Sequence, residues 1–255
     1  MSQNKEKQGH IHPVRLLIEE ITNIFIQIGF NVVDGPELVT EYDNFDSLNF
    51  PADHPAREMQ DTFYIDKDRV SGTNRLLRTQ TSSVQVPYMK KCSEANNFPI
   101  RMIVPGKVFR NESTDATHEM QFFQLEGMVI DKLTNVGDLK YTLEYFLGEV
   151  FSTEAKIRMR PSFFPFVEPG YEVDMTCFKC SDNDSNCALC KGTHWIEILG
   201  AGMIHPNVLR AGGIDPDQYQ GFAFGCGVDR IAMLKWGIDD VRLLYNGDLR
   251  VVNQF

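Results

Sequence analysis

The features that the 255-residue sequence lacks exclude several classes of protein. Long apolar runs are missing, and no stretch approaches the ~18 consecutive apolar residues of a membrane span. Residues 1–9 are polar, with no apolar run behind their lysines, so we expect a disordered lead-in and no secretory signal. Internal repeats, low-complexity tracts and long linkers are also missing, which favours one domain over residues 10–255. These absences predict a cytoplasmic globular protein with no membrane partner.

Positive charge is also scarce. The chain has 25 Lys and Arg against 35 Asp and Glu, for a formal net charge of −10. Phosphate backbones are bound through Lys and Arg, usually on a positive surface. Composition alone therefore does not suggest RNA binding, although an acidic chain can carry a local basic patch or leave RNA contacts to another subunit.

Four of the six cysteines form a spaced cluster, at Cys177, Cys180, Cys187 and Cys190. In a reducing compartment such clusters bind metal more often than they form disulfides. Four thiolates at this spacing can close a tetrahedral structural zinc site that leaves no position open for catalysis. An empty or vestigial knuckle and an iron–sulfur cluster are the alternatives. The isolated Cys92 and Cys226 have the ordinary interpretation of small buried side chains.

The hydrophobic pattern predicts more strands than helices. Apolar residues at helical spacing predict helices over 13–29, 138–152 and 228–236. Strands are predicted over 30–33, 100–112, 118–131, 156–160, 171–176, 194–199 and 220–224. Residues 40–65 are expected to form loops, and 75–89 a polar strand or loop. Most strands pair through hairpins, so the pattern predicts an α+β fold in which an antiparallel sheet is flanked by helices, with a small four-cysteine insert at 177–190.

The predicted hairpin over 100–131 carries polar side chains in an unusual arrangement. Residues two apart share a face of a strand, so Arg110 and Glu112 project together, as do Phe122, Gln124 and Glu126. Arg offers a planar fork that suits phosphate, Glu accepts hydrogen bonds from an amine, and Phe stacks on a planar base. One concave sheet face can thus hold a phosphorylated nucleotide and an ammonium group. The alternative is a solvated sheet face with one exposed Phe.

A glycine-rich turn at Gly225–Gly227 precedes the last predicted helix. Glycines let the backbone approach a ligand, and a helix N-terminus presents free N–H groups to an anion. Arg230 lies in the first turn of this helix, where it can grip a phosphate. The alternative is a structural turn with Arg230 in an ordinary ion pair.

Two aromatic residues, Phe164 and Phe166, share a face if their segment is extended. With neighbouring prolines they can form a rigid slot for a flat apolar side chain, although most such stripes are simply core. His118 lies close enough in sequence to Arg110 to reach a phosphate. Glu168 and Glu197 can hold Mg²⁺ against phosphates, and for Glu197 a buried hydrogen bond is an equal alternative.

These segments occur in an order that resembles the α subunit family of bacterial phenylalanine–tRNA ligases, which are class II aminoacyl-tRNA synthetases. Gly29–Pro36 looks like the end of class II motif 1, Gly106–Glu112 like motif 2, and Gly225–Arg230 like motif 3. Further segments look specific to the family, namely His54–Arg57, Leu76–Ser82, Gln124–Gly127, Phe164–Pro169, His205–Arg210 and Gly221–Gly225. The resemblance covers about residues 10–255.

The resemblance implies an ATP-dependent enzyme that activates L-phenylalanine and transfers it to tRNA(Phe), in an α2β2 heterotetramer with a beta subunit. By similarity, Arg110 contacts the α-phosphate of ATP, Arg230 the γ-phosphate end, and His118 the outer phosphates. Glu112 would contact the adenine amino group, and Phe122 would stack on adenine.

The same resemblance implies an amino-acid site and a metal position. The side chains expected to orient the backbone groups of phenylalanine are Ser82, Gln85, Gln124 and Glu126. Phe164 and Phe166 would contact its ring, with Ala223 at the floor of the pocket. Glu168 matches a family position that binds Mg²⁺ near the beta subunit.

The chain departs from the family pattern in three ways. Gln80 stands where some members have His. We expect a substrate role for Gln80, but the family pattern does not by itself supply it. Many members lack the four-cysteine insert, so a zinc function does not carry over from the family as a whole. The 255 residues also contain no counterpart of the family's N-terminal coiled-coil arm, which predicts weak tRNA binding by this chain alone.

Two rival functions stay open at this point. One is a stand-alone adenylate-forming paralogue that has lost tRNA charging. The other is a zinc-stabilised interaction module on an inactive synthetase fold. The presence of Arg110, Glu112 and Arg230 together argues against the second rival, because an inactive copy would be free to lose them.

Overall fold

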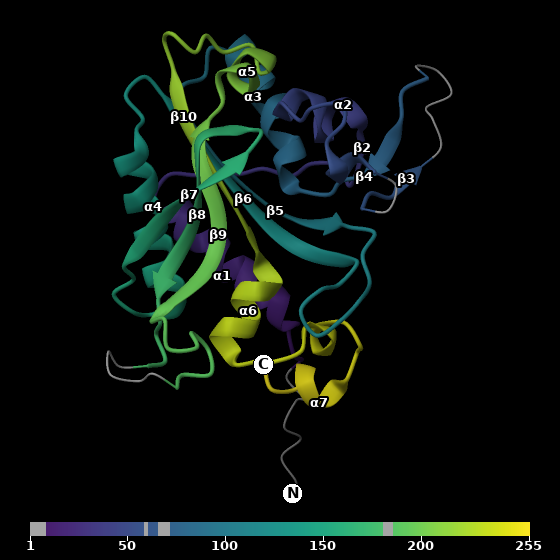
Figure 1. Cartoon of the computed structure of the whole chain (residues 1–255), viewed down its shortest axis with the longest axis vertical. Helices are drawn as coiled ribbons and strands as arrows, with labels where there is room; N and C mark the ends of the chain where they lie inside the picture. The colour runs from purple at the N-terminus through teal and green to yellow at the C-terminus, as the bar shows by residue number, and fades with distance from the viewer. Residues whose placement is uncertain (1–8, 59–60, 66–71, 181–185) are drawn as a thin grey trace, which may run out of the picture.

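A seven-stranded sheet forms the centre of the molecule (Figure 1). The structure is a computed structural model, and it describes residues 9–58, 61–65, 72–180 and 186–255. In sheet order the strands are β1 (Asn31–Val32), β5 (Ile100–Phe109), β6 (Gln121–Asp131), β10 (Gln220–Gly227), β9 (Trp195–Ile204), β8 (Val167–Thr176) and β7 (Ile157–Phe164). Every neighbouring pair is antiparallel except β1 and β5, which run parallel. The predicted α+β class is confirmed, with the correction that the sheet is mixed at one edge.

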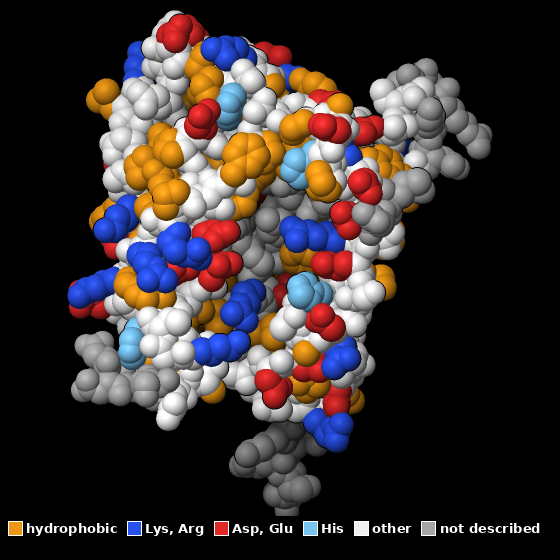
Figure 2. Space-filling model, in the orientation of Figure 1, with side chains coloured by type: hydrophobic (Ala, Val, Ile, Leu, Met, Phe, Trp, Pro, Cys, Tyr) orange, Lys and Arg blue, Asp and Glu red, His pale blue; other side chains and the backbone are white. Residues whose placement is uncertain are grey.

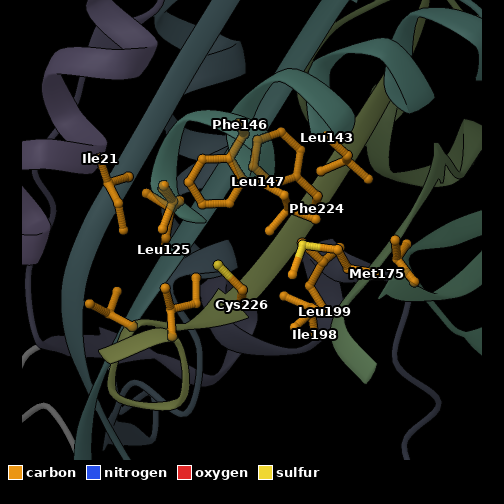
Figure 3. Close-up of a cluster of buried hydrophobic side chains, with 14 of the residues drawn as sticks. Ile21, Leu125, Leu143, Phe146, Leu147, Met175, Ile198, Leu199, Phe224 and Cys226 are labelled. Atoms are coloured by element: carbon orange, nitrogen blue, oxygen red, sulfur yellow. The ribbon is translucent and has the colours of Figure 1, made fainter. Parts of the chain in front are cut away.

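Three helices cover one face of this sheet, namely α1 (Pro13–Gln27), α4 (Val136–Phe151) and α6 (Val228–Trp236). Figure 3 shows part of their core, where Ile21 of α1 and Phe146 of α4 lie among side chains of β6 and β10 such as Leu125 and Phe224. Because side chains alternate along a strand, burying Leu125 on this face turns its neighbours in β6 to the opposite face. The helical layer therefore decides which face of the sheet is free to bind a ligand.

The opposite face is partly covered at one end by α3 (Gln85–Glu94) and α5 (Pro206–Ala211). Beside α3 lies a small three-stranded sheet in the order β2 (Leu38–Thr40), β4 (Arg75–Leu77), β3 (Tyr64–Ile65). Short helical segments complete the described chain, namely α2 (Glu41–Asn44), Asp46–Leu48, Pro55–Arg57, Thr81–Val84, Val241–Leu244 and α7 (Leu249–Val252). Where the chain is described, no helix is both long and apolar enough to cross a bilayer.

The long helices and the main hairpin lie where the sequence predicts them. Helix α1 ends just before Gly29, whose φ of 84° suits glycine. Strands β5 and β6 pair along their full length, from Ile100 opposite Ile130 to Phe109 opposite Gln121. The predicted lead-in falls outside the described residues, apart from Gly9.

Four local predictions are wrong. Residues 40–65 contain short helices and strands rather than loops alone. Residues 85–89 begin helix α3, because Val86, Met89 and Cys92 bury one face at a spacing of three. Gly225–Gly227 forms the end of β10 and not a turn, and Arg110 and Glu112 lie beyond the end of β5, so strand alternation does not place them.

Candidate active site

Two adjoining cavities open on the sheet face that the three long helices leave free. The first, of about 410 Å³, is lined by side chains that include Gln124, Glu126 and Ala223. The second, of about 580 Å³, is lined by a set that includes Glu112, His118, Phe122 and Arg230. Arg110 and Glu197 line both cavities. Figure 2 shows the hollow between the β5–β6 hairpin and strands β7–β9, with basic side chains on several sides of it.

The inner end of the first cavity is built around the buried carboxyl group of Glu126, which is 2 % exposed. It accepts hydrogen bonds from the Ser82 hydroxyl at 2.7 Å and from the Gln85 side-chain amide. Burial raises the pKa of Glu126 to about 8, and these two hydrogen bonds act in the opposite direction. Because both donors are uncharged, a ligand ammonium group at this position would stabilise the ionised form of this carboxyl group.

Glycine in the neighbouring strand gives this end its space. Gly225 of β10 lies opposite Glu126, and a Cβ atom there would stand 3.1 Å from Glu126 Oε2 and 3.2 Å from Gln124 Nε2. The Thr81 backbone N–H donates to Gln124 Oε1 at 3.3 Å. That bond orients the amide group of Gln124, which lines the cavity. The Gln80 side chain, which also lines the cavity, donates to the Asn44 carbonyl at 3.1 Å.

The two aromatic rings do come together, although the geometry predicted for them is wrong. Phe164 ends β7 and Phe166 lies in the turn before β8, so the two side chains do not alternate along one extended run. The turn instead stacks the rings, with centroids 5.9 Å apart and an interplanar angle of 26°. Both rings line the first cavity, as does Ala223. This wall offers a flat apolar surface next to the Glu126 carboxyl group.

The outer cavity holds two arginines and a histidine suited to phosphate, among the carboxyl groups of Glu112, Glu119, Glu197 and Asp229. The Arg110 guanidinium lies 5.1 Å from the centroid of the Phe122 ring, and its Nε donates to the Thr79 carbonyl at 3.4 Å. The cavity walls desolvate this group and lower its pKa, while the charge of Glu112 acts in the opposite direction. Arg230 is exposed in the first turn of α6.

The third group of this cavity suited to phosphate is a histidine on the hairpin loop. His118 pairs with Asp115 at 3.0 Å, and this hydrogen bond raises the pKa of the imidazole. Three groups suited to phosphate therefore face one cavity beside an aromatic ring.

Comparisons with known proteins identify the family. A family model described as tRNA synthetases class II core domain (F) matches residues 1–255. The phenylalanine–tRNA ligase alpha subunit of Bacillus subtilis (strain 168) is 55 % identical over 247 residues, covering 97 % of this chain and 69 % of the relative. The chain belongs to the phenylalanine–tRNA ligase alpha subunit family. A second member, from Clostridium perfringens (strain SM101 / Type A), is 52 % identical over 255 residues, covering all of this chain and 72 % of the relative.

A distant solved structure shares the fold of this alpha subunit family member. The crystal structure of pyrrolysyl-tRNA synthetase from Desulfitobacterium hafniense has a TM-score of 0.67 at 18 % identity, covering 92 % of this chain and 73 % of that one. The class II fold predicted from the motif order is therefore confirmed. The individual residue roles stay predictions. The residues predicted to bind ATP or phenylalanine all line the two adjoining cavities except Gln85, which is buried behind the wall and donates to Glu126.

Glu168 is the predicted site residue that lies apart from the others. It precedes Pro169 near the start of β8, is exposed, and pairs with His205 at 3.3 Å. It is not among the residues that line the two cavities, as far as the described residues define them. Glu197 is exposed as well and pairs with Arg160 at 2.9 Å, so the alternative of a buried hydrogen bond for Glu197 is wrong.

Sequence reasoning missed Asp229, which directly precedes Arg230. Its carboxyl group is buried at the start of α6, where it accepts from the Phe123 backbone N–H at 2.7 Å and from the Tyr245 hydroxyl. Burial raises the pKa of Asp229. These contacts tie α6 to β6 directly beside Phe122. The only available signal was an acidic residue in a helical first turn, which is common at solvated positions.

The four clustered cysteines come together between β8 and β9. Their sulfur atoms all lie within 4.8 Å of one another, with Cys177 and Cys187 at 3.9 Å and Cys180 and Cys190 at 3.5 Å. A Zn–S bond of about 2.3 Å in a tetrahedron places sulfur atoms about 3.8 Å apart, so the arrangement fits zinc. Part of the predicted insert, residues 181–185, lies outside the described chain.

Proposed function

We propose that this chain is a catalytic alpha subunit that activates L-phenylalanine with ATP and transfers it to tRNA(Phe). The observation that carries the proposal is the shared wall of the two cavities. A buried carboxyl group and a flat aromatic slot lie on one side of Arg110, and Arg230 and His118 lie on the other. An amino acid bound at Glu126 by its ammonium group and in the slot by its ring would direct its own carboxylate toward Arg110.

The first chemical step needs positioning more than acid–base catalysis. The phenylalanine carboxylate attacks the α-phosphorus of ATP, a new C–O–P link forms, and the bond to pyrophosphate breaks. The attacking group is already ionised, so the protein has no proton to remove. Arg110 and Arg230 stabilise the charge that develops on the phosphates. In the second step a terminal ribose hydroxyl of tRNA, at the 2′ position by family resemblance, attacks the carbonyl carbon and releases AMP.

Magnesium would screen the phosphate charge when bound with ATP. Glu197 fits that role, because its exposed carboxylate lines both cavities, as Arg110 does. Glu168, the position implied by the family, stays a prediction for a separate Mg²⁺ near the beta subunit. For the cysteine cluster we propose one structural zinc ion, because four thiols at this spacing fill its coordination.

Substrate choice follows from the apolar wall. Phe164, Phe166 and Ala223 offer a tyrosine hydroxyl no polar partner, so we expect the slot to favour phenylalanine. A beta subunit in an α2β2 assembly is the expected partner, and the cytoplasm, where thiols stay reduced, is the expected compartment.

Exchange of labelled pyrophosphate into ATP tests the proposal. The chain is purified with its beta subunit and assayed with phenylalanine, with tyrosine and without amino acid. Phenylalanine should stimulate exchange far above tyrosine, and charging of tRNA(Phe) should follow. Exchange without any charging would instead favour the adenylate-forming paralogue, and no phenylalanine-dependent exchange would contradict the proposal.

A further inference from the structure

A buried arginine lies beneath the site and takes no part in the chemistry described above. Arg78, at the end of β4, is 2 % exposed and is among the largest fully buried side chains. Its Nε donates to the Lys107 carbonyl at 2.7 Å, and its Nη1 donates to the Gly35 carbonyl at 2.9 Å. Burial lowers the pKa of Arg78, and Glu37 and Asp34 act in the opposite direction. Burying a charged group is costly unless hydrogen bonds compensate the loss of water, and here backbone carbonyl groups supply them.

The neighbouring strand is shaped to admit this guanidinium. Gly106 of β5 lies against it, and a Cβ atom at that position would collide with Arg78 Nη2 and stand 3.2 Å from Thr81 Cγ2. The absence of a side chain at Gly106 therefore sets how closely residues 78–81 approach β5.

The segment that follows Arg78 orients three side chains of the site. The Arg78 carbonyl accepts from the Phe109 backbone N–H at 2.9 Å, directly before Arg110. One residue later the Thr79 carbonyl accepts from Arg110 Nε. The Thr81 N–H then holds Gln124, and the Ser82 hydroxyl holds Glu126. Each of these bonds depends on where residues 79–82 sit relative to the hairpin.

We infer that Arg78 is a positioning residue for amino-acid activation, which acts by fixing the 79–82 segment against β5. The inference rests on the proposed function and adds a residue that touches neither substrate. The guanidinium joins β5 to the loop at Gly35, and the side chains that contact phenylalanine and the α-phosphate depend on that junction. Displacing the guanidinium should disturb Arg110 and Gln124 together.

The test compares Arg78→Met with a control of equal structural cost, each purified with the beta subunit. Leu76→Ala is the control, since Leu76 is fully buried on the same strand but packs with Val39 and Phe45. A merely structural defect lowers the active fraction, so kcat falls while the KM for phenylalanine is unchanged. A positioning defect raises that KM as well. We expect Arg78→Met to lose about 100-fold in kcat/KM for phenylalanine, the size of a misplacement of about 1 Å.

Two more variants sharpen the result. Arg78→Lys keeps the charge but has one donor atom instead of a fork, so its loss should be intermediate. Gly106→Ala keeps Arg78 and displaces its guanidinium, so it should raise the KM for phenylalanine in the same way. The inference is overturned if Gly106→Ala behaves as wild type. It is also overturned if Arg78→Met, like the control Leu76→Ala, lowers kcat and leaves the KM for phenylalanine unchanged.

A second measurement separates this inference from the proposed function. Amide hydrogen exchange over residues 79–85 needs no activity, and it should accelerate in Arg78→Met more than in Leu76→Ala. If wild type shows no phenylalanine-dependent exchange of pyrophosphate, the proposed function fails, and the amide data still decide whether Arg78 fixes the segment. Equal acceleration in both variants would refute the role of Arg78.

Discussion

The two ends of the binding hollow are built in opposite ways. At the amino-acid end, Glu126 is buried and held by two side chains from the 82–85 segment. At the nucleotide end, Arg230 is exposed, and 56 % of the His118 side chain is open to solvent. The partner of His118 is Asp115, in the same loop. At the amino-acid end, other side chains of the protein hold the polar group in place. At the nucleotide end, the polar groups are open to solvent and can be hydrated.

Desolvation explains the difference. A polar group removed from water must find partners within the fold, whereas an exposed cation can stay hydrated until an anion arrives. The amino-acid end is therefore expected to exist before the ligand binds, and the nucleotide end to be completed by the triphosphate. Substitutions at the two ends should accordingly differ in their effects on stability and on catalysis.

The largest effect is expected at the exposed end. Arg110→Ala should lower the rate of phenylalanine-dependent pyrophosphate exchange about 1000-fold, because a charge aimed at the reacting phosphate is lost. Its melting temperature should change little, since the guanidinium is not buried in the core. Arg101→Ala, at an exposed residue of β5, the strand that ends directly before Arg110, is the matched control and should keep wild-type activity. A large decrease in the melting temperature of Arg110→Ala would show that the two ends do not differ in their contribution to stability.

The buried end should show the converse pattern. Glu126→Gln should raise the KM for phenylalanine roughly 10- to 100-fold, because the ammonium group loses its charged partner. The melting temperature at pH 8 should not fall, since an amide has no charge to bury. Steady-state kinetics and thermal unfolding of the same preparation measure both quantities. An unchanged KM would show that the ammonium group binds elsewhere.

The third prediction concerns pH and uses the raised pKa of Glu126. The folded empty protein keeps this proton up to about pH 8, while the unfolded chain loses it near its ordinary value of 4.5. The folded state thus binds more protons between these limits, so the free energy of unfolding should fall by up to a few kcal/mol as pH rises through that window. Urea unfolding at pH 6 and pH 8 measures the fall, which should be smaller in Glu126→Gln.

The affinity for phenylalanine should also depend on the ionisation of Glu126. It should increase with pH, whereas the free energy of unfolding decreases. Ionised Glu126 attracts the ammonium group, so the KM for phenylalanine should decrease as pH rises from 6.5 toward 8. Glu126→Gln should flatten this dependence. A wild-type KM that is flat over this range would show that Glu126 is already ionised in the empty site.

The smallest effect on activity is expected from the metal. Cys187→Ser should abolish one bound zinc per chain and lower the melting temperature by roughly 5–10 °C. The KM for phenylalanine should stay within about twofold of wild type, because a structural site leaves no ligand position open to substrate. Cys92→Ala, a buried cysteine outside the cluster, should keep its zinc. Metal analysis that finds no zinc in wild type would contradict the assignment.

How far the site was predictable differs from residue to residue. Gln124 and Glu126 were placed together correctly, because strand alternation fixes which side chains share a face. Gln85 was assigned to a polar strand or loop yet begins helix α3, since three buried residues at helical spacing outweigh a polar composition. Arg78 and Asp229 were not identified, because burial of a charge depends on what packs around it.

By itself the sequence determined the long helices, the β5–β6 hairpin and the cysteine cluster, because each depends on periodicity or spacing along the chain. The family was indicated by the resemblance of its motif segments and their order. Only the tertiary structure decided that Arg110 joins two cavities, that a turn stacks Phe164 on Phe166, and that Glu168 is not among the residues lining either cavity. Periodicity is a local property of the chain. Burial, and with it the cost of each charge, arises only when segments distant in sequence pack together.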